Sequence, residues 1–135
     1  MLSLSRNLKL FSVLMTIYSI VFQNYYNQFL NEENWNYVIL CAAGLFVTSF
    51  ATGLILGWKD PLRNHRNDLG FLYHLMTYIT VNAVAVVWFL AGLSSDKVTP
   101  VMIIMMVISW GVGLLVHHLI SRKTIKGMTK TEAFP

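Results

Sequence analysis

Four apolar runs divide this 135-residue chain, and past Lys9 no Asp, Glu, Lys or Arg lies inside any of them. They cover about residues 9–29, 37–58, 69–93 and 100–120. A helix needs roughly 20 apolar residues to cross a hydrocarbon core of about 30 Å, and in lipid a helix satisfies its own backbone hydrogen bonds. The pattern therefore predicts an all-α membrane protein with four transmembrane helices.

The first run is the least apolar of the four. Its apolar part, residues 10–22, is short for a full crossing. Residues 23–28 then place Tyr25 and Tyr26 among amide side chains, a composition typical of an aromatic belt at a membrane surface. The first helix is therefore expected to extend past the membrane as an outer rim, which also includes Trp35.

Composition supports a membrane protein. Apolar residues make up 56% of the chain and charged residues 12%, whereas a soluble domain carries about 25% charged residues. The length suits one compact unit without a second catalytic domain. The single Cys41 lies inside an apolar run and excludes an intramolecular disulfide.

Nine of the ten basic residues fall on one side of the predicted membrane. They precede the first run, separate the second from the third, or follow the fourth. Only Lys97 falls on the opposite side, together with Glu32, Glu33 and Asp96. The positive-inside rule makes the basic side cytoplasmic, so both termini are expected inside. This orientation accounts for the formal net charge of +4 without direct binding to nucleic acid.

These runs form two tandem helical hairpins. The first hairpin occupies residues 1–58 and the second residues 69–120, with a cytoplasmic linker at 59–68 and a basic cytoplasmic tail at 121–135 that is expected to stay disordered. Thr99 and Pro100 suit the start of the fourth helix, because threonine caps helices and proline fits the first helical position.

Small residues recur every four positions in both hairpins, at Ser49, Gly53 and Gly57 and again at Ser109 and Gly113. Such ridges let helices approach closely. Packing within the chain is the simpler interpretation, and a homodimer is the alternative.

Polar side chains in the second hairpin form the most unusual feature. His74, Tyr78 and Asn82 recur every four residues, and Trp110 and His117 lie on one face of the following helix. In antiparallel helices, His74 and His117 fall at similar depth. We expect a polar cluster that fixes helix register, while a ligand-sensing site and a metal or haem site on the two histidines remain alternatives.

The same residues resemble a known family. The segment 70–82, with Gly70, His74, Tyr78 and Asn82, and the segment Trp110-Gly-Val-Gly-Leu-x-x-His117 resemble the bacterial 2TM domain, a two-helix membrane module. The resemblance covers residues 69–118. It implies a multi-pass protein of a bacterial cell membrane, associated with histidine-kinase or LytTR-type signalling.

Motifs for catalysis are absent from the sequence: it has no phosphate-binding glycine loop, HExxH, paired cysteines or nucleophile elbow. We therefore expect a non-enzymatic regulator. Together with the resemblance, this suggests a membrane-bound inhibitor that sequesters a cytoplasmic LytTR-type transcription regulator. The expected contacts to that partner or to lipid are Arg63, Arg66, Arg122, Lys123, Lys126 and Lys130.

Two other functions remain open. One is a haem- or metal-binding membrane protein that uses His74 and His117, although no cofactor is required by the pattern. The other is a peptide-toxin immunity or transporter accessory protein that acts through the outer rim at Tyr25, Tyr26 and Trp35.

Overall fold

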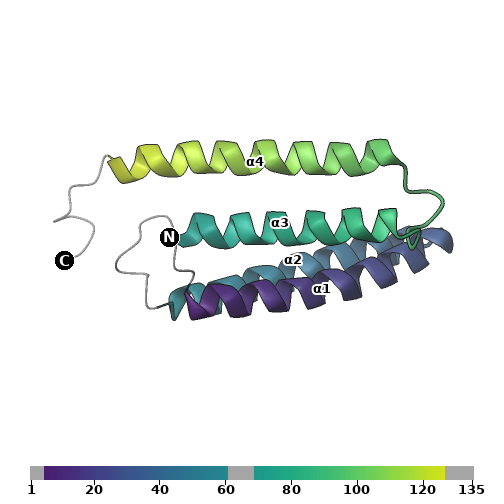
Figure 1. Cartoon of the computed structure of the whole chain (residues 1–135), viewed down its shortest axis with the longest axis horizontal. Coiled ribbons are helices and arrows are strands. Elements are labelled where there is room, and N and C mark those ends of the chain that lie inside the picture. Colours follow the sequence, from purple (N-terminus) through teal and green to yellow (C-terminus); the bar gives the residue numbers. More distant parts are fainter. Residues whose placement is uncertain (1–4, 61–68, 127–135) are drawn as a thin grey trace.

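Four α-helices run alternately up and down in the protein (Figure 1). This computed structural model describes residues 5–60 and 69–126, with side chains as far as Leu119. The helices are α1 (Arg6–Asn31), α2 (Trp35–Trp58), α3 (Leu69–Leu90) and α4 (Pro100–Lys126). The predicted all-helical fold is confirmed for this part of the chain.

Three of the helices are long and apolar enough to cross a membrane. They are α2, α3 and the part of α4 from Pro100 to Leu119. The N-terminal helix α1 does not reach the same apolar content over the length of a span. The structure is therefore that of a membrane protein with at least three helices of spanning composition, and α1 needs a separate argument.

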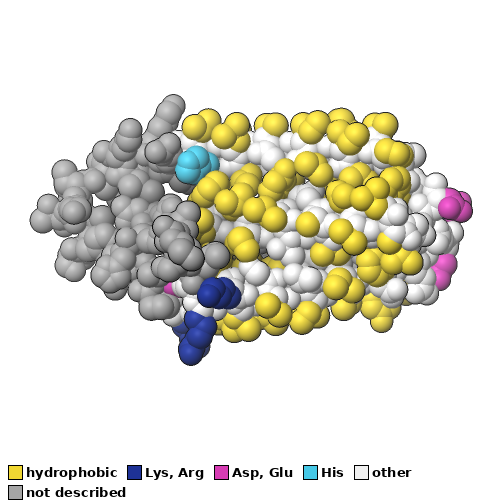
Figure 2. Space-filling view, in the orientation of Figure 1, with side chains coloured by type: hydrophobic (Ala, Val, Ile, Leu, Met, Phe, Trp, Pro, Cys, Tyr) yellow, Lys and Arg dark blue, Asp and Glu magenta, His cyan; other side chains and the backbone are white. Residues whose placement is uncertain are grey.

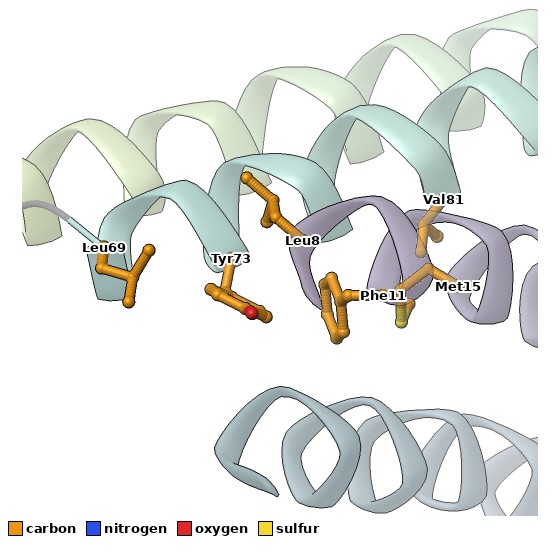
Figure 3. Packing of buried hydrophobic residues seen from close by; sticks show 6 residues of the cluster. All are labelled: Leu8, Phe11, Met15, Leu69, Tyr73 and Val81. Atoms are coloured by element: carbon orange, nitrogen blue, oxygen red, sulfur yellow. The ribbon is translucent and has the colours of Figure 1, made fainter. Parts of the chain in front are cut away.

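The core lies around α1, which contacts both α2 and α3. Leu8, Phe11 and Met15 of α1 are at most 2% exposed, and they pack with Tyr73 and Val81 of α3 (Figure 3). The rings of Phe11 and Tyr73 have centroids 4.9 Å apart. Among the described helices, α1 therefore contributes the most buried side chains, even though it is the least apolar, and α3 contacts each of the other three.

The last helix, α4, is the least attached. Within the described residues it contacts only α3, and none of its described side chains is buried. In Figure 1 it runs beside α3 on the side away from α1 and α2. Its position is therefore set by a single helix interface.

Apolar side chains cover the outside of the bundle. Figure 2 shows them along all visible helices, with acidic side chains gathered at one end and basic side chains at the other. Exposed examples are Ile39, Phe46 and Leu54 on α2 and Val101 and Met105 on α4. A surface that is apolar around its circumference and polar at its ends fits a lipid environment.

Turn residues account for the helix ends. Gly92 has φ +70° and follows α3, while Glu33 has φ 58° in the turn between α1 and α2. As predicted, Thr99 caps α4, since its hydroxyl accepts a 3.3 Å hydrogen bond from the Met102 N–H. α4 continues to Lys126, so the segment from residue 121, which was expected to be disordered, begins as helix.

Candidate functional site

The two histidines singled out in the sequence face each other between α3 and α4. The ring centroids of His74 and His117 are 5.2 Å apart, and their planes meet at 77°. Both side chains are exposed, near the end of the bundle at which α3 begins. No described residue forms a hydrogen bond with either ring. The pair therefore lies together, as the antiparallel arrangement predicted, but not as part of a hydrogen-bonded cluster.

One turn deeper, Tyr78 connects α3 to α4. Its ring lies 6.1 Å from that of Trp110, edge to face, and its hydroxyl donates a 3.2 Å hydrogen bond to the carbonyl of Val107. A Cβ added at Gly111 would meet the Tyr78 hydroxyl at 3.1 Å. Gly111 therefore lets the tyrosine approach the backbone of α4.

Asn82 does not join these residues. It is 6% exposed, whereas His74, two turns earlier on α3, is exposed. Its Nδ2 donates a 2.7 Å hydrogen bond to the carbonyl of Tyr78, and its Oδ1 is buried without a hydrogen-bond partner among the described atoms. Four of the five residues of the expected cluster therefore lie in two ring pairs across α3 and α4, whereas Asn82 is hydrogen-bonded within α3.

A buried polar row on α1 was not recognised in the sequence. Ser19, Gln23 and Asn27 are 0%, 8% and 5% exposed. Asn27 donates to the carbonyl of Gln23 (2.7 Å), and its Oδ1 accepts a 2.8 Å hydrogen bond from the backbone N–H of Ser95. This amide ties α1 to the connection between α3 and α4. The four-residue spacing of Ser19, Gln23 and Asn27 was the signal in the sequence that could have placed them on one side of the helix.

The second unrecognised group closes the opposite end of the bundle. Asp60, directly after α2, is 4% exposed. Its Oδ2 accepts a 3.0 Å hydrogen bond from the Tyr73 hydroxyl and another from the Ser5 hydroxyl. Ser5 also caps α1 by accepting from the N–H of Leu8 (3.0 Å). We call Ser5, Asp60 and Tyr73 the clasp, because they join the ends of three helices.

The predicted small-residue ridges differ between the hairpins. On α2, a Cβ at Gly53 would lie 3.5 Å from the Phe11 ring, and one at Gly57 would lie 3.8 Å from the Tyr73 ring. Ser49 is partly buried on the same helix. On α4, Ser109 and Gly113 are exposed, and nothing lies within 4 Å of a Cβ at Gly113. The α2 ridge therefore packs inside the chain.

At the end opposite the clasp, aromatic rings stack along the junction of α1 and α2. Phe29 lies between Tyr25 and Tyr37, with centroid distances of 6.2 and 5.1 Å. The same end carries an exposed ion pair between Lys97 Nζ and Glu33 Oε1 (2.7 Å). The hydrogen bond from Lys97 and the positive charge of Lys97 lower the pKa of Glu33. Tyr25, which was expected in an aromatic outer rim, therefore lies at the same end of the bundle as the acidic Glu33.

Several predicted contact residues lie outside this description. Arg63, Arg66 and Lys130 fall outside the described residues, and the side chains of Arg122, Lys123 and Lys126 do too, although their backbone belongs to α4. Within the described part, no three His, Cys, Asp or Glu side chains form a metal-binding group. Cys41 is a free thiol.

The two buried asparagines are expected to respond oppositely to substitution. Asn27→Leu should lower the free energy of unfolding by about 1–3 kcal/mol, because it leaves the buried Ser95 N–H without its acceptor. Asn82→Leu should leave stability unchanged or raise it, because it removes a buried oxygen that has no partner. Equilibrium unfolding in detergent measures both. An equal loss in the two variants would contradict this assignment.

The chain was compared with protein-family models, with curated proteins and with solved structures, and none of the three comparisons produced a match.

Proposed function

We propose that the protein is a non-enzymatic regulator of a bacterial cell membrane, which holds a cytoplasmic transcription regulator of LytTR type at the membrane and so inhibits it. The class of partner rests on the resemblance of residues 69–118 to the 2TM domain. The mode of action rests on how α4 is attached. The proposal includes four spans, with both termini in the cytoplasm.

The two faces of α1 support a fourth span. Its exposed side includes Leu10, Val13, Ile17, Ile20 and Val21, whereas its buried side carries Ser19, Gln23 and Asn27. A helix in water shows the opposite arrangement. Ser19, Gln23 and Asn27 lower the overall apolar content of α1, but these three side chains are buried against other helices and do not face lipid. α1 therefore suits a membrane despite its composition.

Charges at the two ends support the orientation. Arg6 and Lys9 begin α1 and Lys59 follows α2, all at the end of the clasp. Glu32, Glu33 and Asp96 lie in the turns at the other end, the end at which Figure 2 shows acidic side chains. Basic residues favour the cytoplasmic side, and this supports the proposal that the clasp end, with the continuation of α4, faces the cytoplasm.

The observation that carries the regulatory function is the course of α4. It packs on α3 alone, and its backbone stays helical from the membrane span to Lys126. A shift of α4 against α3 inside the membrane would therefore move a basic helical segment on the cytoplasmic side. That segment contains Arg122, Lys123 and Lys126, which suits an acidic surface on a partner protein.

Affinity purification from native membranes in mild detergent, followed by mass spectrometry, tests the proposal. A cytoplasmic DNA-binding regulator is expected at near-stoichiometric level. Replacing Arg122, Lys123, Lys126 and Lys130 together by glutamine should reduce its recovery at least about tenfold, since each lost charge contact weakens the complex. Lys97→Gln, a basic residue at the opposite end, is the matched control. Recovery of only a transporter, or of no partner, would refute the proposal.

A second candidate function uses the outer rim. The exposed, stacked rings of Tyr25 and Tyr37 and the 59% exposed Trp35 offer an aromatic surface for a peptide. An immunity or transporter accessory role then predicts that a deletion strain is sensitive to peptide antibiotics. Complementation by the Trp35→Ala variant should fail, whereas the glutamine variant described above should complement.

A further inference from the structure

We infer that His74 and His117 form an open binding site for a divalent transition-metal ion such as Zn²⁺, which bridges α3 and α4. The two imidazoles come from different helices and face each other at the rim of the clasp end. This site concerns the isolated protein and does not depend on the identity of any partner.

The separation of the rings matches what one metal ion requires. An imidazole nitrogen binds Zn²⁺ at about 2.0–2.1 Å, which puts each ring centroid about 3.2 Å from the metal and two centroids about 5 Å apart at a tetrahedral angle. The observed distance between the His74 and His117 centroids is 5.2 Å. The separation of the two rings is therefore the separation expected for two imidazoles on one ion.

Both imidazoles are available as ligands. Their side chains are exposed, and no described residue hydrogen-bonds to either ring. His118 is different, because its ring stacks on Phe71 with centroids 4.2 Å apart. Two protein ligands leave positions for water, as in sites that keep an open coordination position. Imidazole selects zinc or copper over magnesium or calcium, which prefer oxygen ligands.

A metal ion here would affect α4 more than any other helix. Within the described chain α4 is held only by α3, and its described contacts to that helix are ring contacts and one hydrogen bond from Tyr78. Coordination of one ion by both histidines would join α3 to α4 strongly at the end from which α4 continues to Lys126. The occupied site would thus fix the direction of that continuation.

Calorimetric titration of the purified full chain in detergent with Zn²⁺ tests the site. One ion per chain is expected. His74→Ala and His117→Ala should each weaken Zn²⁺ binding at least about tenfold. Loss of a residue that only hydrogen-bonds to a metal ligand lowers metal affinity about 10–100-fold, and loss of the ligand itself should cost no less. His118→Ala is the matched control and should bind as the parent protein does, with helical content checked by circular dichroism for all variants.

Cu²⁺ provides a second readout of the same ligands. Its electron paramagnetic resonance spectrum should show coupling to two nitrogens in the parent protein and in His118→Ala, and to fewer in His74→Ala or His117→Ala. Absence of Zn²⁺ binding at micromolar concentration overturns the inference. Binding that persists in His74→Ala overturns it too, because it would place the ion on other groups, such as His65.

Discussion

Replacing Phe11 by alanine is expected to lower the free energy of unfolding by about 3 kcal/mol. Phe11 is 1% exposed and touches two helices at once: its ring lies 4.9 Å from that of Tyr73 on α3 and 3.5 Å from the Cβ position of Gly53 on α2. Lipid chains cannot reach a cavity enclosed by three helices. The loss of stability therefore comes from packing contacts that the alanine variant no longer makes. Such packing contacts drive helix association in membranes.

Leu10→Ala is the control, because Leu10 precedes Phe11 on α1 but is 49% exposed. It should change stability by less than about 1 kcal/mol, since lipid replaces the lost contacts. The measurement is reversible unfolding in mixed micelles, followed by circular dichroism. Similar losses in both variants would show that α1 is not packed between α2 and α3.

Asp60→Ala is expected to lower the free energy of unfolding by about 2–4 kcal/mol, because the hydroxyls of Ser5 and Tyr73 both lose their acceptor in a buried place. Asp60→Asn keeps one oxygen and should lose less. Tyr73→Phe removes one of the two donors, and the double variant Asp60→Ala/Tyr73→Phe should cost less than the sum of the singles.

Tyr78→Phe provides the matched comparison for the clasp. Its hydroxyl also donates one hydrogen bond, but to a backbone carbonyl of α4. It should cost about 1 kcal/mol and should not couple to Asp60→Ala. The same unfolding assay measures all of these variants. Additive losses for Asp60 and Tyr73 would argue against a shared hydrogen bond.

Much of the architecture could be predicted from the apolar runs. Their number and spacing predicted four helices, and their termini agree with the structure within a few residues except at the end of α4. The proximity of His74 and His117 followed from antiparallel order alone. These features depend on chain direction and helix length, which the sequence states directly.

Which side of a helix faces inward could not be predicted from spacing alone. Asn82 lies two turns after His74, in a row that turns by only about 40° for each step of four residues, yet Asn82 is buried and His74 is exposed. Gln23 and Asn27 were interpreted as part of a surface belt, because polar residues near a span end usually contact water, and Ser19 as part of the apolar run. Their burial depends on α2 and α3, which are distant in sequence.

The burial of Asp60 could not be predicted from the sequence either. Asp60 is followed by proline, and the basic residues Lys59 and Arg63 stand on either side of this pair. Such a sequence is typical of an exposed loop. In the folded chain Asp60 is an interior residue that accepts hydrogen bonds from Ser5 and Tyr73. Contacts over 55 and 13 residues of sequence leave no local periodic signal.

The polar inner face of α1 has a consequence for biogenesis. A helix that carries Ser19, Gln23 and Asn27 gains little from entering lipid alone, because each polar group is costly in hydrocarbon until a neighbouring helix covers it. Although α1 precedes the other described helices in the chain, it would then be among the last of them to reach its final place. Its stable insertion would have to wait for α2 and α3, which makes the nascent N-terminal segment dependent on its own downstream sequence.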